Sequence, residues 1–337
     1  MLYVTTRGTK DAYTAYRTLG EERSPDGGLF VPFQMPHFSE EQIAALADKS
    51  FSQAVADIIN IFLNARMDSW DVEFCIGRHA SKVVSMSHRI FMAELWHNPD
   101  YDYARLVRNL TAKVQGRGDI SGVLTDWAWI VTRIAVLFGI FAQLYRTNSA
   151  EIGSLIDIAM SAGDFAGPMA AWYAREMGLP IGNIICSSVG NDCLWDLLHN
   201  GQISMANSSD IPADIERLVA ATLGVDEANR FVTCAAQKLQ YQISEEALEQ
   251  IGNGLYAAVV SNSRAENIIN RVYQMSGYVL EPGAAMAFGG LQDYRTSAGE
   301  TRNAIIIAEQ CPICSAEVVA KAMSISVQTL RERMNLT

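Results

Sequence analysis

The sequence predicts an α/β fold in which helices flank a parallel sheet, preceded by a smaller helical region. The chain has 337 residues, of which 49% are apolar, and this is enough to form a large core. Residues 155–188 have the pattern strand, tight turn, helix, strand, which is the unit that builds parallel sheets. We expect residues 1–95 to form the N-terminal helical region and residues 96–337 to form the main α/β domain.

Within this unit, residues 155–162 are predicted to be a buried strand and residues 163–167 a tight turn. The helix that follows has Pro168 in its first turn and ends before Gly178, and residues 181–188 form the next strand. A glycine-containing turn before a helix N-terminus offers N–H groups to a phosphate or carboxylate. The alternative is an ordinary crossover turn that binds nothing.

Polar residues also follow the second strand, at the end of a sheet where ligands bind in open α/β folds. Asn191 and Asp192 occupy this place, although they could equally cap the next helix. The candidate ligand-binding residues at this end of the sheet are Gly163, Asp164, Phe165, Ala166, Gly167, Asn191 and Asp192.

Several segments resemble the threonine synthase family, in the family's order. Residues 163–192 are similar to a Gly-Asn-Phe-Gly-Asp phosphate loop that leads into a helix, Met-Gly-Leu-Pro-Ile, a strand and Asn-Asp. Residues 24–32 contain the family's Pro-Asp-Gly-Gly-Leu-Phe-Val-Pro, and residues 6–8 its Thr-Arg-Gly. Residues 94–99 resemble Glu-Leu-Phe-His-Gly-Pro, and residues 281–285 resemble Glu-Pro-His-Ala-Ala. The resemblance implies the tryptophan synthase β-like fold of fold-type II pyridoxal phosphate enzymes.

The lysine that carries pyridoxal phosphate in that family has no counterpart here. The family motif continues into Thr-Leu-Ala-Phe-Lys-Asp, whereas residues 100–105 are Asp-Tyr-Asp-Tyr-Ala-Arg. The lysine position falls on Ala104, or on Arg105 if the alignment shifts by one, and neither side chain can form an imine. We therefore expect that covalent attachment is lost and that the protein uses no cofactor. The chain's six lysines are Lys10, Lys49, Lys82, Lys113, Lys238 and Lys321.

A second loss concerns the small lid domain that follows this motif in the family. Residues between about 105 and 119 are too few to form a domain, so we expect the lid to be missing and the sheet to be truncated relative to the family. The phosphate loop is also altered. Asp164 brings a negative charge to it, and Ala166 replaces a glycine that would adopt a positive φ at less cost.

Outside this loop, the candidate catalytic residues are His97, Glu281, Cys311 and Cys314. His97 could instead hold a turn, and Glu281 could instead start a helix. Cys311 and Cys314 have Cys-x-x-Cys spacing near a predicted helix N-terminus, where thiolate is favoured, although a lone pair of this kind is usually structural. Arg7 is the basic residue of the matched motifs that could meet an anion, or it could brace the N-terminal region. No metal cluster is predicted.

Composition limits the partners. A net charge of −11 without a Lys/Arg cluster argues against nucleic acid. The N-terminus lacks a secretory signal, which with six cysteines favours reduced thiols in the cytoplasm. The apolar stretch 123–145 contains Asp126 and Arg133, so we predict a buried or interface helix rather than a membrane span. We expect it to be covered by a second subunit in a homodimer, or else by residues 51–63.

Three functions remain open. The first is a non-catalytic protein that binds a small phosphorylated or amino-acid-like ligand, or a biosynthetic partner protein, in the remaining cleft. The second is an enzyme of a specialised amino-acid pathway, repurposed to work without pyridoxal phosphate. The third is a threonine-synthase-type lyase completed by another subunit.

Overall fold

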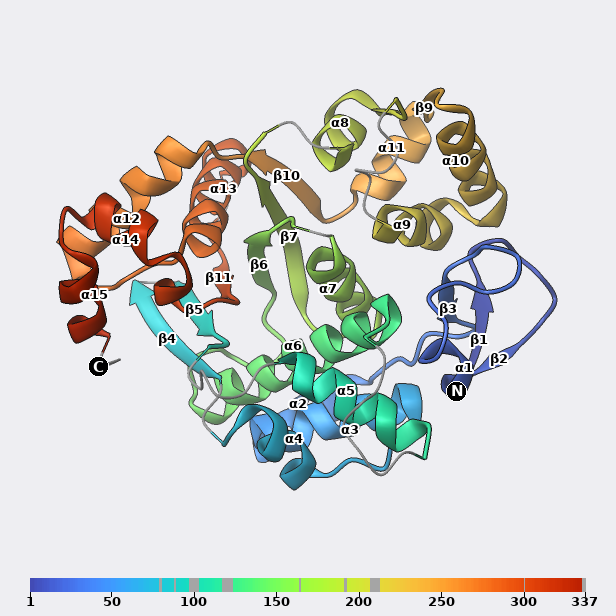
Figure 1. Ribbon diagram of the computed structural model, residues 1–337, viewed down its shortest axis with the longest axis horizontal. Coiled ribbons are helices and arrows are strands. Elements are labelled where there is room, and N and C mark those ends of the chain that lie inside the picture. Colours follow the sequence, from blue (N-terminus) through green and yellow to red (C-terminus); the bar gives the residue numbers. More distant parts are fainter. Residues whose placement is uncertain are drawn as a thin grey trace.

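The computed structural model describes residues 1–78, 81–87, 89–96, 103–116, 124–163, 165–190, 193–206, 213–299 and 301–334. Its centre is a six-stranded sheet in the order β10-β7-β6-β11-β5-β4 (Figure 1). The strands from β10 to β5 in this order are parallel to one another, and β4 is antiparallel to β5 at the edge. The α/β fold class is therefore confirmed. The strands are β4 (Lys82–Ser87), β5 (Ile90–Glu94), β6 (Ile156–Ser161), β7 (Ile181–Ser188), β10 (Leu255–Val259) and β11 (Asn303–Ala308).

The predicted strand–turn–helix–strand unit is present as β6, α7 (Ala166–Glu176) and β7. Its helix ends because Gly178 adopts a φ of +98°, a backbone conformation that a residue with a Cβ rarely adopts. The chain turns there and Pro180 leads into β7, as the sequence predicted. This unit places the turn before α7 at the carboxyl end of β6.

Helices cover both faces of the sheet. Along β11, Ile305 and Ile307 belong to one core cluster and Ile306 to another, because successive side chains of a strand point to opposite faces. The face of Ile306 is covered by α13 (Pro282–Ala298), which contacts β6, β7 and β11. Against α13 packs α12 (Asn262–Ser276) (Figure 1). α14 (Ala316–Met323) packs against α12, and it contacts the short helix η3 (Pro312–Ser315) and α15 (Val327–Arg333).

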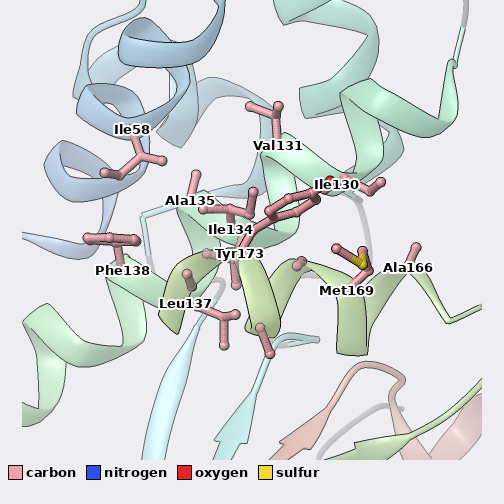
Figure 2. Packing of buried hydrophobic residues seen from close by; sticks show 14 of the residues in the cluster. Ile58, Ile130, Val131, Ile134, Ala135, Leu137, Phe138, Ala166, Met169 and Tyr173 are labelled. Atoms are coloured by element: carbon pink, nitrogen blue, oxygen red, sulfur yellow. The ribbon is translucent and has the colours of Figure 1, made fainter. Parts of the chain in front are cut away.

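The apolar helix α6 (Asp126–Arg146) lies in the core on the other side, between α3 (Phe51–Leu63) and α7 (Figure 2). Gly139 lets α3 approach closely, since a Cβ there would lie 2.6 Å from the ring of Phe51. Nearly all apolar side chains of α6, Phe138 among them, are buried by other parts of this one chain. The prediction that a second subunit covers α6 is therefore wrong, and the alternative, residues 51–63, is confirmed. By length and composition α6 could cross a membrane, but 83% of its apolar window is buried inside the fold.

The N-terminal region contains more than helices. Its three-stranded antiparallel sheet has the order β2-β1-β3. Strands β4 and β5 precede residue 95 yet belong to the central sheet, so that sheet begins before the division we predicted. The other N-terminal elements are β1 (Leu2–Thr5), β2 (Tyr13–Thr14), α1 (Ala15–Thr18), β3 (Phe30–Pro32), α2 (Glu40–Ala44), η1 (Ala45–Asp48) and α4 (Ser69–Ile76).

Between β7 and β10 the chain forms a separate group of helices, of which only the first was anticipated from the sequence (Figure 1). It comprises α8 (Cys193–Asn200), β8 (Gln202–Ser204), α9 (Ala213–Leu223), α10 (Val225–Gln237), β9 (Gln240–Gln242) and α11 (Glu245–Gly252). Where the lid was expected to be missing, α5 (Tyr103–Val114) is followed by α6 with only residues 115–125 between them.

Candidate functional site

A pocket of about 550 Å³ lies at the carboxyl ends of β5, β6 and β11, where open parallel sheets bind ligands. The start of α5, one side of α6 and the start of α7 complete its wall. Its volume is in the usual range for small-molecule sites. The lining residues are Leu95, Trp96, Tyr103, Ala104, Trp129, Thr132, Arg133, Val136, Leu137, Ile140, Met160, Gly167, Ile307, Glu309, Gln310, Cys311 and Cys314.

Ala104 lies in this wall, on the first turn of α5. The neighbouring Arg105 places its guanidinium 4.5 Å from the ring centre of Phe74 on α4, and it is not part of the pocket wall. Of the two positions that the family lysine could match, Ala104 is therefore the one at the pocket. All six lysines lie among the residues that the structure describes, and none of them lines the pocket. Lys113 is the lysine nearest to Ala104 in the sequence, and its Nζ lies 2.7 Å from Oδ1 of Asp71.

The turn before α7 reaches the pocket through Gly167. Gly163 and Phe165 have φ values of +44° and +66°, and the buried Phe165 precedes the first helical residue, Ala166. Ala166 lies in the helix and has no positive φ, so our expectation of backbone strain at Ala166 is wrong. The residue with the positive φ is Phe165. The Phe165 N–H already donates to the carbonyl of Ala162 at 2.7 Å.

The charged groups of the pocket are Arg133 on α6 and Glu309 just after β11. Their closest atoms, Nη2 and Oε2, are 3.5 Å apart, and the side chains are 25% and 49% exposed. The Arg133 guanidinium also lies 5.6 Å from the ring centre of Trp129, within the range of a cation–π contact. Glu309 approaches the start of α7, since a Cβ at Gly167 would lie 3.9 Å from its Oε1. A carboxylate thus occupies the neighbourhood of the helix N-terminus that would attract an anion.

Tyr103 adds a polar group to this wall. Its hydroxyl oxygen is buried and has no hydrogen-bond partner among the residues that the structure describes. Burial, and secondarily the charge of Glu309, raises the pKa of this hydroxyl far above its ordinary value of 10.0. The group is therefore a neutral hydroxyl that can donate one hydrogen bond and accept another.

Cys311 and Cys314 both line the pocket, and both are free thiols. The Cys314 N–H donates to the Cys311 carbonyl at 2.8 Å, which closes the turn that begins η3. Burial raises the pKa of the Cys311 thiol, so the structure does not support our expectation of a favoured thiolate at Cys311. Among the described residues no group of three or more His, Cys, Asp or Glu side chains could hold a metal ion.

Glu281 does not line the pocket and starts α13. Its carboxylate accepts hydrogen bonds from the backbone N–H groups of Gly283, at 2.6 Å, and Ala284, at 2.5 Å, as a helix N-cap does. Burial nevertheless raises its pKa from 4.5 to about 7. Nearby, the Tyr278 hydroxyl donates to the buried carboxylate of Glu94.

Arg7 lies outside the pocket, in the N-terminal region, where it pairs with Glu216 of α9 at 3.3 Å. Thr6 donates a hydrogen bond to the same carboxylate, and Asp26 accepts hydrogen bonds from Thr5 and the backbone of Gly28. These motif residues therefore brace the N-terminal region against α9. The remaining candidates, His97, Asp164, Asn191 and Asp192, lie outside the described residues.

Four residues singled out from the sequence line the pocket: Ala104, Gly167, Cys311 and Cys314. Four further lining residues were not singled out as candidates: Tyr103, Trp129, Arg133 and Glu309. One signal was available, because Arg133 is a charge inside an otherwise apolar helix. Such a charge must find water or a partner, and a pocket provides both.

Comparisons with known proteins agree with this architecture. Residues 2–79 match the family model described as threonine synthase N terminus. The human protein named threonine synthase-like 1 is 25% identical over 177 residues, which cover 48% of this chain and 24% of that protein. The chain thus spans about a quarter of the length of those relatives. The threonine synthase of Schizosaccharomyces pombe is 18% identical over 84% of this chain and 82% of its own length.

Two solved structures share the fold. The pyridoxal-phosphate-bound threonine synthase of Brucella melitensis superimposes with a TM-score of 0.79 at 20% identity, covering 96% of this chain and 92% of that one. The yeast threonine synthase also gives 0.79, at 15% identity, over 100% and 94% of the two chains. At these identities the likeness shows the fold alone.

Proposed function

This chain belongs to the threonine synthase family, and from that premise we propose that it has lost the family's Schiff-base chemistry. It is a non-catalytic protein that binds a small ligand or a partner in the remaining cleft. The observation that carries this proposal is Ala104 in the pocket wall, at the position where the resemblance expects the lysine. The alanine side chain has no nitrogen with which to form an imine, and none of the chain's six lysines lines the pocket.

The residues of the pocket do not fit pyridoxal phosphate. A phosphate at the start of α7 would lie next to the Glu309 carboxylate, and like charges at short range repel. The Phe165 N–H is directed to the Ala162 carbonyl instead of to a ligand. Arg133 is a possible phosphate partner, but it lies beside Glu309. We therefore derive no reaction step from this cofactor.

One observation favours a second function, an enzyme repurposed to work without pyridoxal phosphate. Cys311 and Cys314 place two thiols in the pocket wall, where either one could attack a bound electrophile once it is deprotonated. The raised pKa of Cys311 weighs against this function near neutral pH. A lyase completed by another subunit requires that subunit to supply the lysine.

Cytoplasmic location stays part of the proposal and is supported by the six cysteines, all of them free thiols. A homodimer also stays a prediction. Its interface has to lie outside α6, because that helix is covered within the chain.

Borohydride reduction of the purified protein with excess pyridoxal phosphate, followed by peptide mass spectrometry, tests the proposal. We expect no pyridoxyl group on a pocket peptide of the wild-type protein, whereas an active threonine synthase treated in parallel is labelled at its lysine. Pyridoxal phosphate should also leave the melting temperature unchanged, since a ligand that binds only the native state must raise it. Stoichiometric labelling of one lysine would overturn the proposal.

A further inference from the structure

The pocket is apolar over most of its wall. Leu137 and Ile140 of α6, Met160 of β6 and Ile307 of β11 meet where the sheet and the helix come together, and Ala104 leaves room beside them. Trp96 and Trp129 add two large rings to the lining. A hydrocarbon or aromatic group that enters this space gains free energy in proportion to the apolar area that it removes from water.

The polar groups of the wall are of both charges. Charge-assisted N–H···O contacts are usually about 2.7–2.9 Å long, so the Arg133–Glu309 contact at 3.5 Å is a loose one. A ligand that carries one anionic and one cationic group can bind the guanidinium and the carboxylate at the same time. A ligand with only one charge can pair with only one of these two side chains.

Tyr103 contributes a further polar side chain to the pocket lining. Its hydroxyl is buried and lacks a partner among the described residues, although buried polar groups are nearly always hydrogen-bonded.

We propose that the pocket binds a large apolar α-amino acid that is not phosphorylated. Its carboxylate pairs with Arg133, its ammonium pairs with Glu309, and its side chain lies against the apolar wall. The inference rests on the proposed function, because it requires a cleft that pyridoxal phosphate does not occupy. A phosphate group is disfavoured because Glu309 lies at the start of α7.

Isothermal titration calorimetry of the full chain with L-phenylalanine tests the proposal. The comparison ligands are L-phenylalaninamide, which lacks the carboxylate, 3-phenylpropanoate, which lacks the ammonium, and O-phospho-L-serine. We expect L-phenylalanine to bind, each of its two analogues to bind at least about tenfold more weakly, and O-phospho-L-serine not to bind. Equal affinity for L-phenylalanine and both analogues would show apolar partitioning without recognition of the two charges, and would overturn the proposal.

Variants identify the site. Arg133→Gln should weaken L-phenylalanine binding roughly tenfold to a hundredfold, because it removes a charge-assisted contact. Glu309→Gln should act in the same direction. Arg146→Gln, on the exposed last residue of the same helix, is the matched control and should leave affinity unchanged. Affinity that is the same in Arg133→Gln and wild type would place the ligand elsewhere and refute the assignment.

The outcomes separate this inference from the proposed function. A pyridoxyl-lysine after borohydride treatment overturns the proposed function whatever L-phenylalanine does. If no pyridoxyl-lysine forms and L-phenylalanine fails to bind up to the millimolar range, only the amino-acid inference is lost. Tighter binding of O-phospho-L-serine than of L-phenylalanine would reverse the predicted preference and overturn it as well.

Discussion

Two arginine–carboxylate pairs in this molecule have opposite characters. Arg217 on α9 is completely buried, hydrogen-bonds Asp214 and donates from Nε to the Phe30 carbonyl at 3.3 Å. Arg133 on α6 is one-quarter exposed and meets Glu309 at 3.5 Å on the wall of the pocket. The first pair joins α9 to the N-terminal region, and the second faces open space.

The difference separates a pair that is buried inside the fold from a pair that lies on the wall of the pocket. The Thr-Arg-Gly and Asp-Gly-Gly motifs, which carried the family resemblance, lie on the closed side around Glu216 and α9. Arg133, on the wall of the pocket, belongs to no recognised motif. The Thr-Arg-Gly and Asp-Gly-Gly motifs therefore belong to the scaffold, whereas the residues matched to the lysine motif and the phosphate loop include Ala104 and Gly167 of the pocket wall. The four predictions below test this contrast, from the largest expected effect to the smallest.

The largest effect is expected at Phe138, which faces α3 on the closed side of α6 (Figure 2). Phe138→Glu puts a carboxylate into an apolar core, at a cost comparable to the whole stability of a typical domain, roughly 5–15 kcal/mol. We expect insoluble protein. Phe33→Glu, at a phenylalanine that is 70% exposed, is the control and should remain folded in circular dichroism. A soluble, folded Phe138→Glu monomer would show that this side of α6 is not core.

Arg217→Met should destabilise the protein by about 3–5 kcal/mol in denaturant unfolding, because Asp214 would remain as a buried charge without its partner. Adding Asp214→Asn should recover part of this loss. A change below about 1 kcal/mol would mean that the closed pair contributes as little as a surface pair does.

Glu281, buried at the start of α13, makes the stability of the fold depend on pH. Its pKa is about 7 in the fold and 4.5 ordinarily, so the folded state binds the proton more tightly. Its contribution to stability is therefore fully present below pH 4.5 and falls as pH rises to about 7, by up to about 3 kcal/mol. Glu281→Gln should flatten this part of the stability profile, whereas Glu245→Gln, at an exposed helix start, should not. Parallel wild-type and Glu281→Gln profiles would contradict the assignment.

The smallest effect is expected at the open pair. Arg133→Gln should change the free energy of unfolding by no more than about 0.5 kcal/mol, because the guanidinium is partly exposed and its contact with Glu309 is loose. Chemical denaturation measures this directly, with Arg217→Met beside it. Losses of equal size in the two variants would remove the distinction between them.

The sequence allowed the central unit of the fold to be predicted because its signals are local. Two apolar runs bounded by glycine and proline became β6 and β7, and β7 has the predicted bounds, Ile181–Ser188. The sequence could not decide whether α6 is covered by a second subunit or by residues 51–63, because a helix that is apolar on all sides does not specify its neighbours. Of the helices between β7 and β10, only the one after Asn191 and Asp192 was anticipated, although α9, α10 and α11 are amphipathic.

The site was predictable only in part, for a similar reason. Ala104 could be predicted to lie at the site because the family motif identified it as the position of the lysine. Arg133 and Glu309 are 176 residues apart and meet only when β11 enters the sheet. The role of Arg7 was left open between an anion contact and a brace, because sequence alone could not show that Glu216, more than two hundred residues away, lies beside it.

The position of β11 has a consequence for the order of assembly. β11 lies between β5 and β6, yet it is the last strand of the sheet to be synthesised. Until the ribosome releases residues 303–308, no strand joins the pair β4–β5 to the strands β6, β7 and β10 by backbone hydrogen bonds. The edges of β5 and β6 that later pair with β11 stay unpaired until then. Such edges attract other chains. We therefore expect the growing chain to depend on chaperones until this late stage, and truncations before Asn303 to aggregate.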